Sequence, residues 1–238
     1  MIQKTKAIVI SSLKYSDSSL IVHCYTEGYG IKAYMLKGIL KSKKGPIRKS
    51  FFQPLTQLEL VANHNNKGNL NSIREAQITQ HYQHLHTDII KQSIVLFVSE
   101  VLSTCLKEEE ANPDLFHYLE TAFAWLDIND KTANFPILFL LQLTKYLGFY
   151  PEANFDKLFF DLAEGKFTNS PNSSYFVKKP EIDYLRTLLG TTFEALSEVK
   201  FNAKQRQQIL ELLIQYINLH LHTFRTPKSL KVLHAIFQ

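Results

Sequence analysis

A lysine-rich segment between residues 37 and 49 is the part of the sequence whose residue types most clearly indicate a chemistry. It has no acidic residue, and its glycines and proline are typical of a loop. Proteins that bind single-stranded nucleic acid combine a cationic groove for the phosphates with aromatic rings that stack on the bases. We therefore predict a nucleic-acid-binding site at Lys37, Lys41, Lys43, Lys44, Arg48, Lys49 and Tyr34. A solvated hairpin whose lysines only aid solubility is the alternative interpretation.

The basic charge is concentrated in the first third of the chain. Residues 1–80 carry twelve Lys or Arg and four Asp or Glu, a net charge of +8. The remaining residues carry fifteen against eighteen, a net charge of −3, so the whole chain has a formal charge of +5. This asymmetry indicates an anionic partner for the N-terminal region.

The other candidate residues do not form a set that supports catalysis or metal binding. His81, His84 and His86 lie close in sequence, but no cysteine or carboxylate completes a metal-binding set. Cys24 and Cys105 are far apart, which excludes a disulfide framework, and both are expected to be buried. The sequence also lacks a phosphate-binding glycine loop and a nucleophile-elbow pattern. We therefore expect a protein that is not an enzyme and uses no cofactor or metal.

Turn residues divide the first 80 residues into short segments that are rich in β-branched and aromatic residues. This pattern predicts five strands, over residues 4–13, 19–26, 31–37, 55–62 and 70–76. Few of the connections are long enough to hold a helix. Five short strands in so few residues predict a small closed barrel, for which an OB-fold is the natural candidate.

From residue 79 onward, apolar residues recur every three or four positions, which predicts helices. Two helices start at recognisable caps, Asn112 before Pro113 and Asn202 with Gln205, which resembles a capping box. A helix over 134–147 is apolar on nearly every side, so we expect it at the centre of a bundle. Two further helices are predicted over 90–105 and from Thr226-Pro227 onward.

Residues 150–180 are expected to form a long irregular insertion, with at most a short hairpin, packed on the bundle. The sequence thus predicts an α+β protein with an OB-fold domain over residues 1–79 and a helical domain over 80–238. The N-terminus lacks the apolar stretch of a signal peptide, and the most apolar run, residues 135–143, is shorter than the about 20 residues that cross a bilayer. We therefore expect a soluble cytoplasmic protein with no membrane partner.

Several pieces of the chain resemble, in the same order, the RecO family of DNA repair proteins. The opening is similar at AIVISS (7–12), YSDSS (15–19) and YTEGYG (25–30). LKGILKSK (36–43), followed by QPL (53–55), is similar to the family's KGARR segment. LLQLTKYLGFYP (140–151) resembles the family's central helix and the turn after it, and KSLKVL (228–233) resembles its C-terminal signature. Each piece is weakly specific, but together they cover the whole chain at the right spacing.

The resemblance implies an N-terminal OB-fold and a C-terminal helical domain. It implies binding to single- and double-stranded DNA, strand annealing, and help in loading the RecA recombinase onto DNA coated by single-stranded-DNA-binding protein at the nucleoid. RecR and the acidic, Phe-ended C-terminal tail of that coating protein are the implied partners. By position, Lys37 and Lys41 correspond to the family's DNA-binding residues.

Many RecO proteins carry a four-cysteine zinc site in the stretch that corresponds to residues 150–180, where this chain has no cysteine. We therefore expect zinc to be absent. We expect its structural role to be taken over by the packing of Phe155, Phe159, Phe160, Phe167 and Tyr175.

Two other interpretations of the sequence stay open. The barrel is also compatible with an RNA-binding or ribosome-associated OB-fold module that has no role in recombination. The barrel is further compatible with a delivery module for an enzyme whose active site lies in the helical half.

Overall fold

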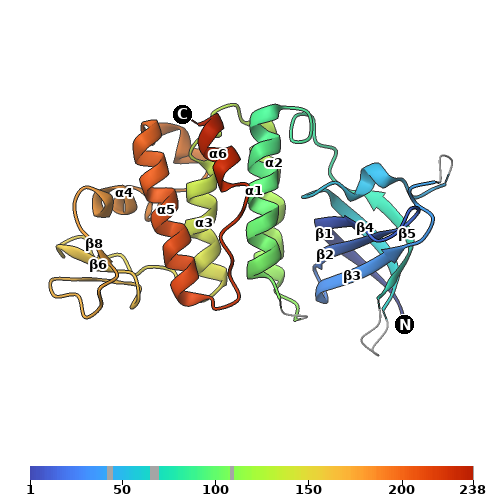
Figure 1. Cartoon of the computed structure of the whole chain (residues 1–238), viewed down its shortest axis with the longest axis horizontal. Coiled ribbons are helices and arrows are strands. Elements are labelled where there is room, and N and C mark those ends of the chain that lie inside the picture. The colour runs from blue at the N-terminus through green and yellow to red at the C-terminus, as the bar shows by residue number, and fades with distance from the viewer. Residues whose placement is uncertain (42–44, 65–69, 108–109, 238) are drawn as a thin grey trace. The chain divides into compact units, whose positions relative to one another are not determined.

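The computed structural model describes residues 1–41, 45–64, 70–107 and 110–237. It divides the chain into two compact units, Met1–Asp127 and Ile128–Gln238 (Figure 1). The first unit holds a β-barrel with helices α1 and α2, and the second holds helices α3 to α6 with a small sheet. None of the described helices is long and apolar enough to span a membrane.

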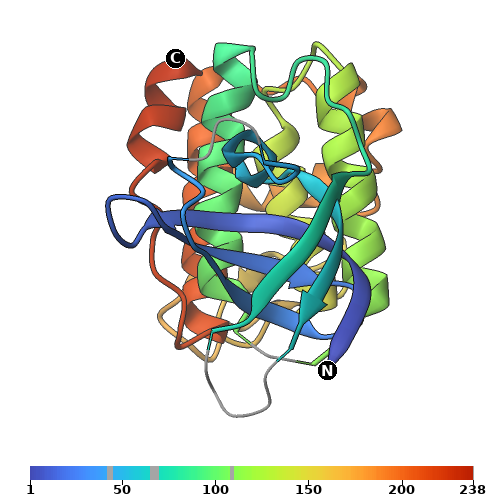
Figure 2. The same cartoon turned by 90° about the vertical axis from the view of Figure 1, so that its right-hand side faces the viewer.

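Five strands of the first unit form a curled antiparallel sheet in the order β3-β2-β1-β4-β5 (Figure 2). The two edge strands meet at Asn71, whose N–H donates to the Ala33 carbonyl and whose carbonyl accepts from the Met35 N–H, both at 2.9 Å. This parallel bridge is the arrangement expected for the partly open five-stranded barrel of an OB-fold, which confirms the α+β prediction. The strands are β1 (Ile2–Lys14), β2 (Leu20–Thr26), β3 (Gly30–Leu36), β4 (Gln57–Asn63) and β5 (Ser72–Ile78).

β1 is buried on both faces at its centre, which explains its continuous apolar run. Ala7 and Val9 belong to the barrel core, together with residues of β2, β3 and β4. Ile8 and Ile10 are also buried and alternate with them along the strand, so they point to the other face. Helix α1 packs against β1, and the first unit is therefore a barrel backed by helices.

The two helices of the first unit begin at capping side chains. α1 (Ile89–Cys105) starts after Asp88, whose carboxylate accepts the N–H groups of Ile90 and Lys91. α2 (Pro113–Ile128) starts after Asn112, whose side-chain oxygen accepts the Leu115 N–H at 3.0 Å, as the sequence predicted.

Asp127 ties the segment between the barrel and α1 to the end of α2. Its buried carboxylate accepts the backbone N–H groups of Gln83, His84 and Leu85 at 2.7–2.9 Å. Its carbonyl oxygen accepts the buried ammonium of Lys91. Burial by itself would raise the pKa of the Asp127 carboxyl, but the three backbone hydrogen bonds and Lys91 outweigh it and hold that pKa below its usual value.

α3 (Phe135–Tyr146) lies at the centre of the second unit, as its apolar sequence predicted. Every side chain from Phe135 to Leu141 is buried. α5 (Ala203–His220) packs against α3 and starts with the predicted capping box of Asn202 and Gln205. α6 (Leu230–Ile236) begins later than predicted, because the residues after Pro227 form a turn in which the Leu230 N–H donates to the Pro227 carbonyl.

Residues 150–180 contain a small three-stranded sheet. Its strands are β6 (Phe159–Asp161), β7 (Lys166–Thr168) and β8 (Phe176–Val177), in the order β7-β6-β8. Strands of two or three residues are too short to show a hydrophobic period, so the sequence indicated no more than a hairpin here. The short helices that follow, α4 (Glu181–Leu188) and η2 (Glu194–Glu198), were not predicted.

The buried carboxylate of Asp161 holds the loops of this sheet together. One carboxylate oxygen accepts the N–H groups of Ala163 and Glu164 and the hydroxyl of Ser173. The other accepts the N–H groups of Asn172 and Ser173. Polar anchoring of this kind was not predicted, because some of the donors lie 11 or 12 residues from Asp161 in the sequence.

The predicted aromatic packing is present in part. Phe160 and Phe167 are buried, with ring centroids 4.9 Å apart. The rings of Phe159 and Phe176 pack edge-on, with their centroids 5.4 Å apart. Phe155 packs edge-on against Phe167, with ring centroids 6.4 Å apart, although both Phe155 and Tyr175 remain about half exposed.

Candidate nucleic-acid interface

The lysine-rich segment connects β3 to β4 and is anchored to the barrel at both ends. Near its start, Gly38 has a φ of +73°, and the Leu40 N–H donates to the Ser18 carbonyl of the β1–β2 turn at 3.0 Å. Its far end runs into the 3-10 helix η1 (Lys49–Phe52), which places Phe52 in the barrel core. These anchors hold the described part of the segment against the barrel surface.

Four of the six predicted basic residues lie in the described part of the chain, and all four are exposed: Lys37, Lys41, Arg48 and Lys49. Within that part, no carboxylate lies at ion-pair distance from any of them. Two other lysines of the barrel are paired, Lys4 with Glu59 at 2.8 Å and Lys6 with Glu120 at 3.3 Å. The described part of the segment therefore presents positive charge that no described carboxylate neutralises by an ion pair.

The two remaining lysines of the predicted site, Lys43 and Lys44, lie outside the described residues. Their assignment to the site stays a prediction from charge.

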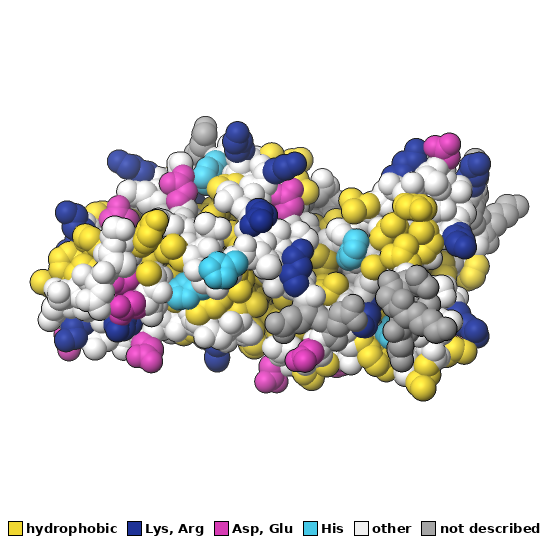
Figure 3. All heavy atoms as spheres, turned by 60° about the horizontal axis from the view of Figure 1, so that its bottom comes forward, with side chains coloured by type: hydrophobic (Ala, Val, Ile, Leu, Met, Phe, Trp, Pro, Cys, Tyr) yellow, Lys and Arg dark blue, Asp and Glu magenta, His cyan; other side chains and the backbone are white. Residues whose placement is uncertain are grey.

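A groove of about 550 Å³ lies beside the segment. The end of β3, the segment and the start of β5 line it, with Met35, Ile39, Ile47 and Ile73 as apolar residues and Lys37 as the cation. On the barrel surface in Figure 3, hydrophobic side chains lie next to Lys and Arg side chains. An apolar groove next to unpaired cations has the composition that single-stranded nucleic acids require.

The prediction that the Tyr34 ring lies in this interface is wrong. Tyr34 is completely buried in the barrel core, and its hydroxyl is 2.9 Å from Nε2 of the buried His64. Burial, reinforced by Cys24 and Tyr29, raises the pKa of the Tyr34 hydroxyl. A ring with no exposed surface cannot stack on a base. The strand register, which points Tyr34 inward, could not be read from its type alone.

Tyr15 is an exposed aromatic residue near the lysine-rich segment and was not among the predicted site residues. It is 64% exposed and lies in the β1–β2 turn, which also contains Ser18. Its exposure could have been predicted from its position in the polar turn YSDSS, because an aromatic ring in such a turn is not expected in the core.

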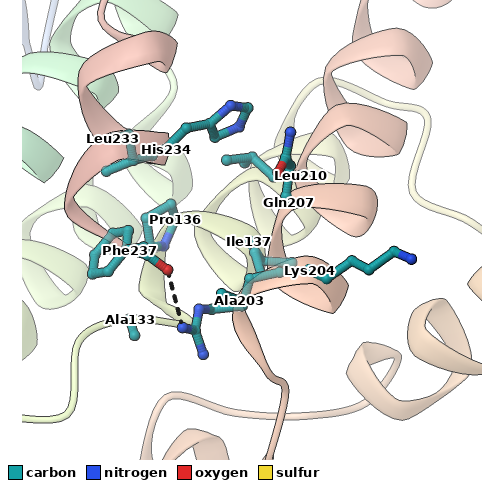
Figure 4. A pocket seen from close by; sticks show the side chains of 11 residues that line it. Ala133, Pro136, Ile137, Ala203, Lys204, Gln207, Leu210, Leu233, His234 and Phe237 are labelled. Atoms are coloured by element: carbon teal, nitrogen blue, oxygen red, sulfur yellow. Dashed lines mark hydrogen bonds between the residues drawn. The ribbon is translucent and has the colours of Figure 1, made fainter.

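An apolar pocket of about 260 Å³ lies in the second unit. It is bounded by the start of α3, the first turns of α5 and the end of α6 (Figure 4). The apolar residues that line it are Ala133, Pro136, Ile137, Ala203, Leu210, Leu233 and Phe237.

The pocket also contains polar groups that suit an anionic ligand. Lys204 and Gln207 line it and are exposed. Arg206 donates from Nη2 to the Phe237 carbonyl at 3.3 Å, the interaction dashed in Figure 4. Nε of Arg206 and Nε2 of His234 are buried and have no hydrogen-bond partner in the described part of the chain. Buried polar atoms are normally satisfied, so these two indicate capacity for further hydrogen bonds.

The described residues contain no group of three His, Cys, Asp or Glu side chains placed to hold a metal ion. Cys24 and Cys105 are buried, as predicted. Burial raises the pKa of both thiols, that of Cys105 to about 12, so neither is a ready thiolate nucleophile.

Two family models match the chain in sequence order. The model "Recombination protein O N terminal" matches residues 1–82, and "Recombination protein O C terminal" matches residues 86–230. The chain belongs to the RecO family. Among its RecO relatives, the DNA repair protein RecO of Christiangramia forsetii is 48% identical over 238 residues, which cover all of both chains.

More distant RecO proteins also align from end to end. The DNA repair protein RecO of Flavobacterium johnsoniae is 43% identical over 235 residues, or 98% of each chain, and that of Porphyromonas gingivalis is 28% identical over 244 residues, or all of each chain. Membership of the RecO family gives this chain a role in DNA repair and recombination.

The zinc site carried by many RecO proteins does not fit this chain. Residues 150–180 contain no cysteine, and the two cysteines of the chain belong to the first unit. Where a zinc ribbon would hold its loops with thiolates, this sheet uses the hydrogen bonds of Asp161.

Proposed function

We propose that this RecO chain binds single- and double-stranded DNA through the lysine-rich segment of its barrel, anneals strands, and assists the loading of RecA on DNA coated by single-stranded-DNA-binding protein. Binding captures the phosphate backbone electrostatically, and annealing follows when two strands are neutralised at once, without nucleotide hydrolysis. RecR and the coating protein are the partners, and the site of action is the cytoplasmic nucleoid.

The observation that carries the DNA-binding proposal is the set of exposed, unpaired cations beside an apolar groove. Lys37 and Lys41 are the residues that also correspond to the family's DNA-binding positions. Arg48 and Lys49 extend the same charge toward η1, and the predicted Lys43 and Lys44 complete the segment. Cations already paired with carboxylates contribute less to phosphate binding, because a bound phosphate must first displace the partner.

The double variant Lys37→Glu/Lys41→Glu tests this site. Both side chains are exposed and unpaired in the described structure, so the fold should be retained while two phosphate contacts become repulsive. We expect affinity for single- and double-stranded DNA to fall by about tenfold or more, measured by fluorescence anisotropy, and annealing to fall with it.

The matched control is Lys131→Glu/Lys145→Glu, which makes the same change of charge at two exposed lysines of the second unit. The control should retain most of the affinity. Equal losses in both variants, or full binding by the first, would contradict the site assignment. Preference for RNA over DNA of the same sequence would instead favour the RNA-binding interpretation of the barrel.

We further propose that the pocket of the second unit binds the acidic, Phe-ended tail of the coating protein. The apolar walls suit an aromatic side chain, and Lys204, Arg206 and His234 suit the terminal carboxylate and acidic side chains. A volume of about 260 Å³ is appropriate for one aromatic residue with part of its neighbour.

A fluorescent peptide with acidic residues and a C-terminal Phe tests the pocket. Lys204→Glu should weaken peptide binding by about tenfold, because it places a carboxylate next to an anionic ligand. Lys200→Glu makes the same change at an exposed lysine outside the pocket and should bind normally. Unchanged binding by Lys204→Glu, or equal binding of a peptide with a C-terminal amide, would count against the pocket.

A further inference from the structure

The turn between β1 and β2 carries an exposed ring beside the lysine-rich segment. Tyr15 is 64% exposed, and its hydroxyl makes no hydrogen bond within the described part of the chain. Its backbone N–H donates to the Ser19 carbonyl at 3.0 Å, and the Ser18 carbonyl accepts the Leu40 N–H at 3.0 Å. The backbone of the turn is therefore fixed against the segment, while most of the Tyr15 ring faces solvent.

Tyr15 and Lys37 follow directly on the last paired row of the barrel strands β1 and β3. The last paired row across β1, β2 and β3 is Lys14, Leu20 and Leu36, and Tyr15 and Lys37 are the first residues after the ends of β1 and β3. Neighbouring strands lie about 4.8 Å apart, so the backbones of Lys14 and Leu36, which precede Tyr15 and Lys37, are separated by about 10 Å. One single strand can thus place a base on the ring and a neighbouring phosphate at the ammonium.

An apolar row joins the turn to the groove. Leu13 pairs with Ile21, and Ile21 pairs with Met35, which lines the groove. Leu13 is 58% exposed, and Ile21 and Met35 are partly exposed. Exposed apolar residues in a continuous row favour contact with unpaired bases, whose faces are apolar, over contact with phosphates alone.

We propose that Tyr15 is the residue on which a base of single-stranded DNA stacks, while Lys37 and Lys41 hold the adjacent phosphates. Lys37 and Lys41, which are unpaired in the described part of the chain, favour a polyanion over an apolar protein partner. This inference rests on the proposed DNA-binding function and adds a residue that distinguishes unpaired bases from duplex.

The variants Tyr15→Ala and Tyr15→Phe test the stacking role. Alanine removes the ring, so affinity for single-stranded DNA should fall by about tenfold, within the range of one lost base–aromatic stack. Phenylalanine keeps the ring and should restore binding to near the original value. Affinity for blunt duplex DNA should stay unchanged in both variants, because its bases are already stacked on each other.

Two controls separate stacking from general damage. Tyr175→Ala removes an exposed tyrosine of the second unit and should not affect DNA binding. Thermal unfolding of Tyr15→Ala should match the parent chain. The salt dependence of its single-strand binding should also match, because no charge is lost.

The outcomes distinguish this inference from the function on which it rests. Loss of DNA binding in Lys37→Glu/Lys41→Glu together with normal single-strand affinity in Tyr15→Ala would overturn the stacking role and leave the DNA-binding proposal intact. An equal loss of single- and double-strand affinity in Tyr15→Ala, or a failure of Tyr15→Phe to restore binding, would also overturn it. A parent chain that binds no DNA would overturn both.

Discussion

Asp161 has no exposed surface, and its carboxylate accepts five hydrogen bonds from the loops that surround β6. Burial by itself would raise the pKa of this carboxyl, but the hydrogen bonds from Ser173, Glu164 and Ala163 outweigh it and hold the pKa below its usual value. A carboxyl whose pKa is lower in the folded than in the unfolded chain stabilises the fold at every pH at which the carboxyl is charged.

Asp161→Asn should destabilise the protein by about 2–3 kcal/mol at pH 7, because the amide NH₂ would face backbone donors that then lack an acceptor. The stabilisation by Asp161 is complete above the unfolded pKa of about 4 and is lost as pH falls through the lower folded pKa. Denaturant unfolding should therefore show the parent and the variant converging in acid. Asp156→Asn, at an exposed position of the same segment, is the control. A variant as stable as the parent at pH 7 would contradict this role.

For single residues, residue type predicted the exposure of the lysines in the basic segment, but it did not predict which tyrosines are buried. Lys37 and Lys41 are exposed because an ammonium is costly to bury unless it finds a hydrogen-bond partner, as the buried Lys91 does at the Asp127 carbonyl. Tyrosine is stable in a core or at a surface, since its ring is apolar and its hydroxyl needs one partner. Tyr34 finds that partner in His64 and is buried, whereas Tyr15 is exposed.

At the scale of elements, the long ones were predictable and the short ones were not. The five strands of the barrel and helices α1, α2, α3 and α5 lie within a few residues of their predicted positions, because caps, turn residues and hydrophobic periods mark them. β6 to β8 and α4 contain eight residues or fewer, and a period repeats too few times in them. Their stability comes from tertiary contacts such as those of Asp161, which no local pattern records.

At the scale of the whole molecule, positive charge is distributed unevenly along the chain. Residues 1–80 carry +8 and the remainder −3, so long-range attraction to a polyanion should act through the barrel. The acidic excess of the remainder lies in residues 81–127, which carry two Lys or Arg and eight Asp or Glu, whereas the second unit carries thirteen against ten. The pocket of the second unit is lined by Lys204 and Arg206, which suits a small anionic ligand.

Binding to single-stranded DNA should weaken steeply with salt. If about six phosphates are contacted, the logarithm of affinity should fall against the logarithm of salt concentration with a slope of about −4, because bound counterions are released. Titrations at several potassium chloride concentrations measure this slope, and Lys37→Glu/Lys41→Glu should make it shallower. A slope near zero in the parent chain would exclude electrostatic capture.

The sequence by itself determined the five-stranded barrel, the helical remainder, the basic segment and the RecO resemblance, because each depends on local patterns or on residue order. Only the tertiary structure decided which aromatic rings face solvent, that Asp161 anchors the small sheet, and that Lys204, Arg206 and His234 meet at an apolar pocket. These features depend on strand register and on contacts between residues far apart in the chain. A one-residue shift in register moves every side chain of a strand from the core face to the surface face. The sequence pattern does not specify the face of a tyrosine, because its side chain is stable in the core and at the surface.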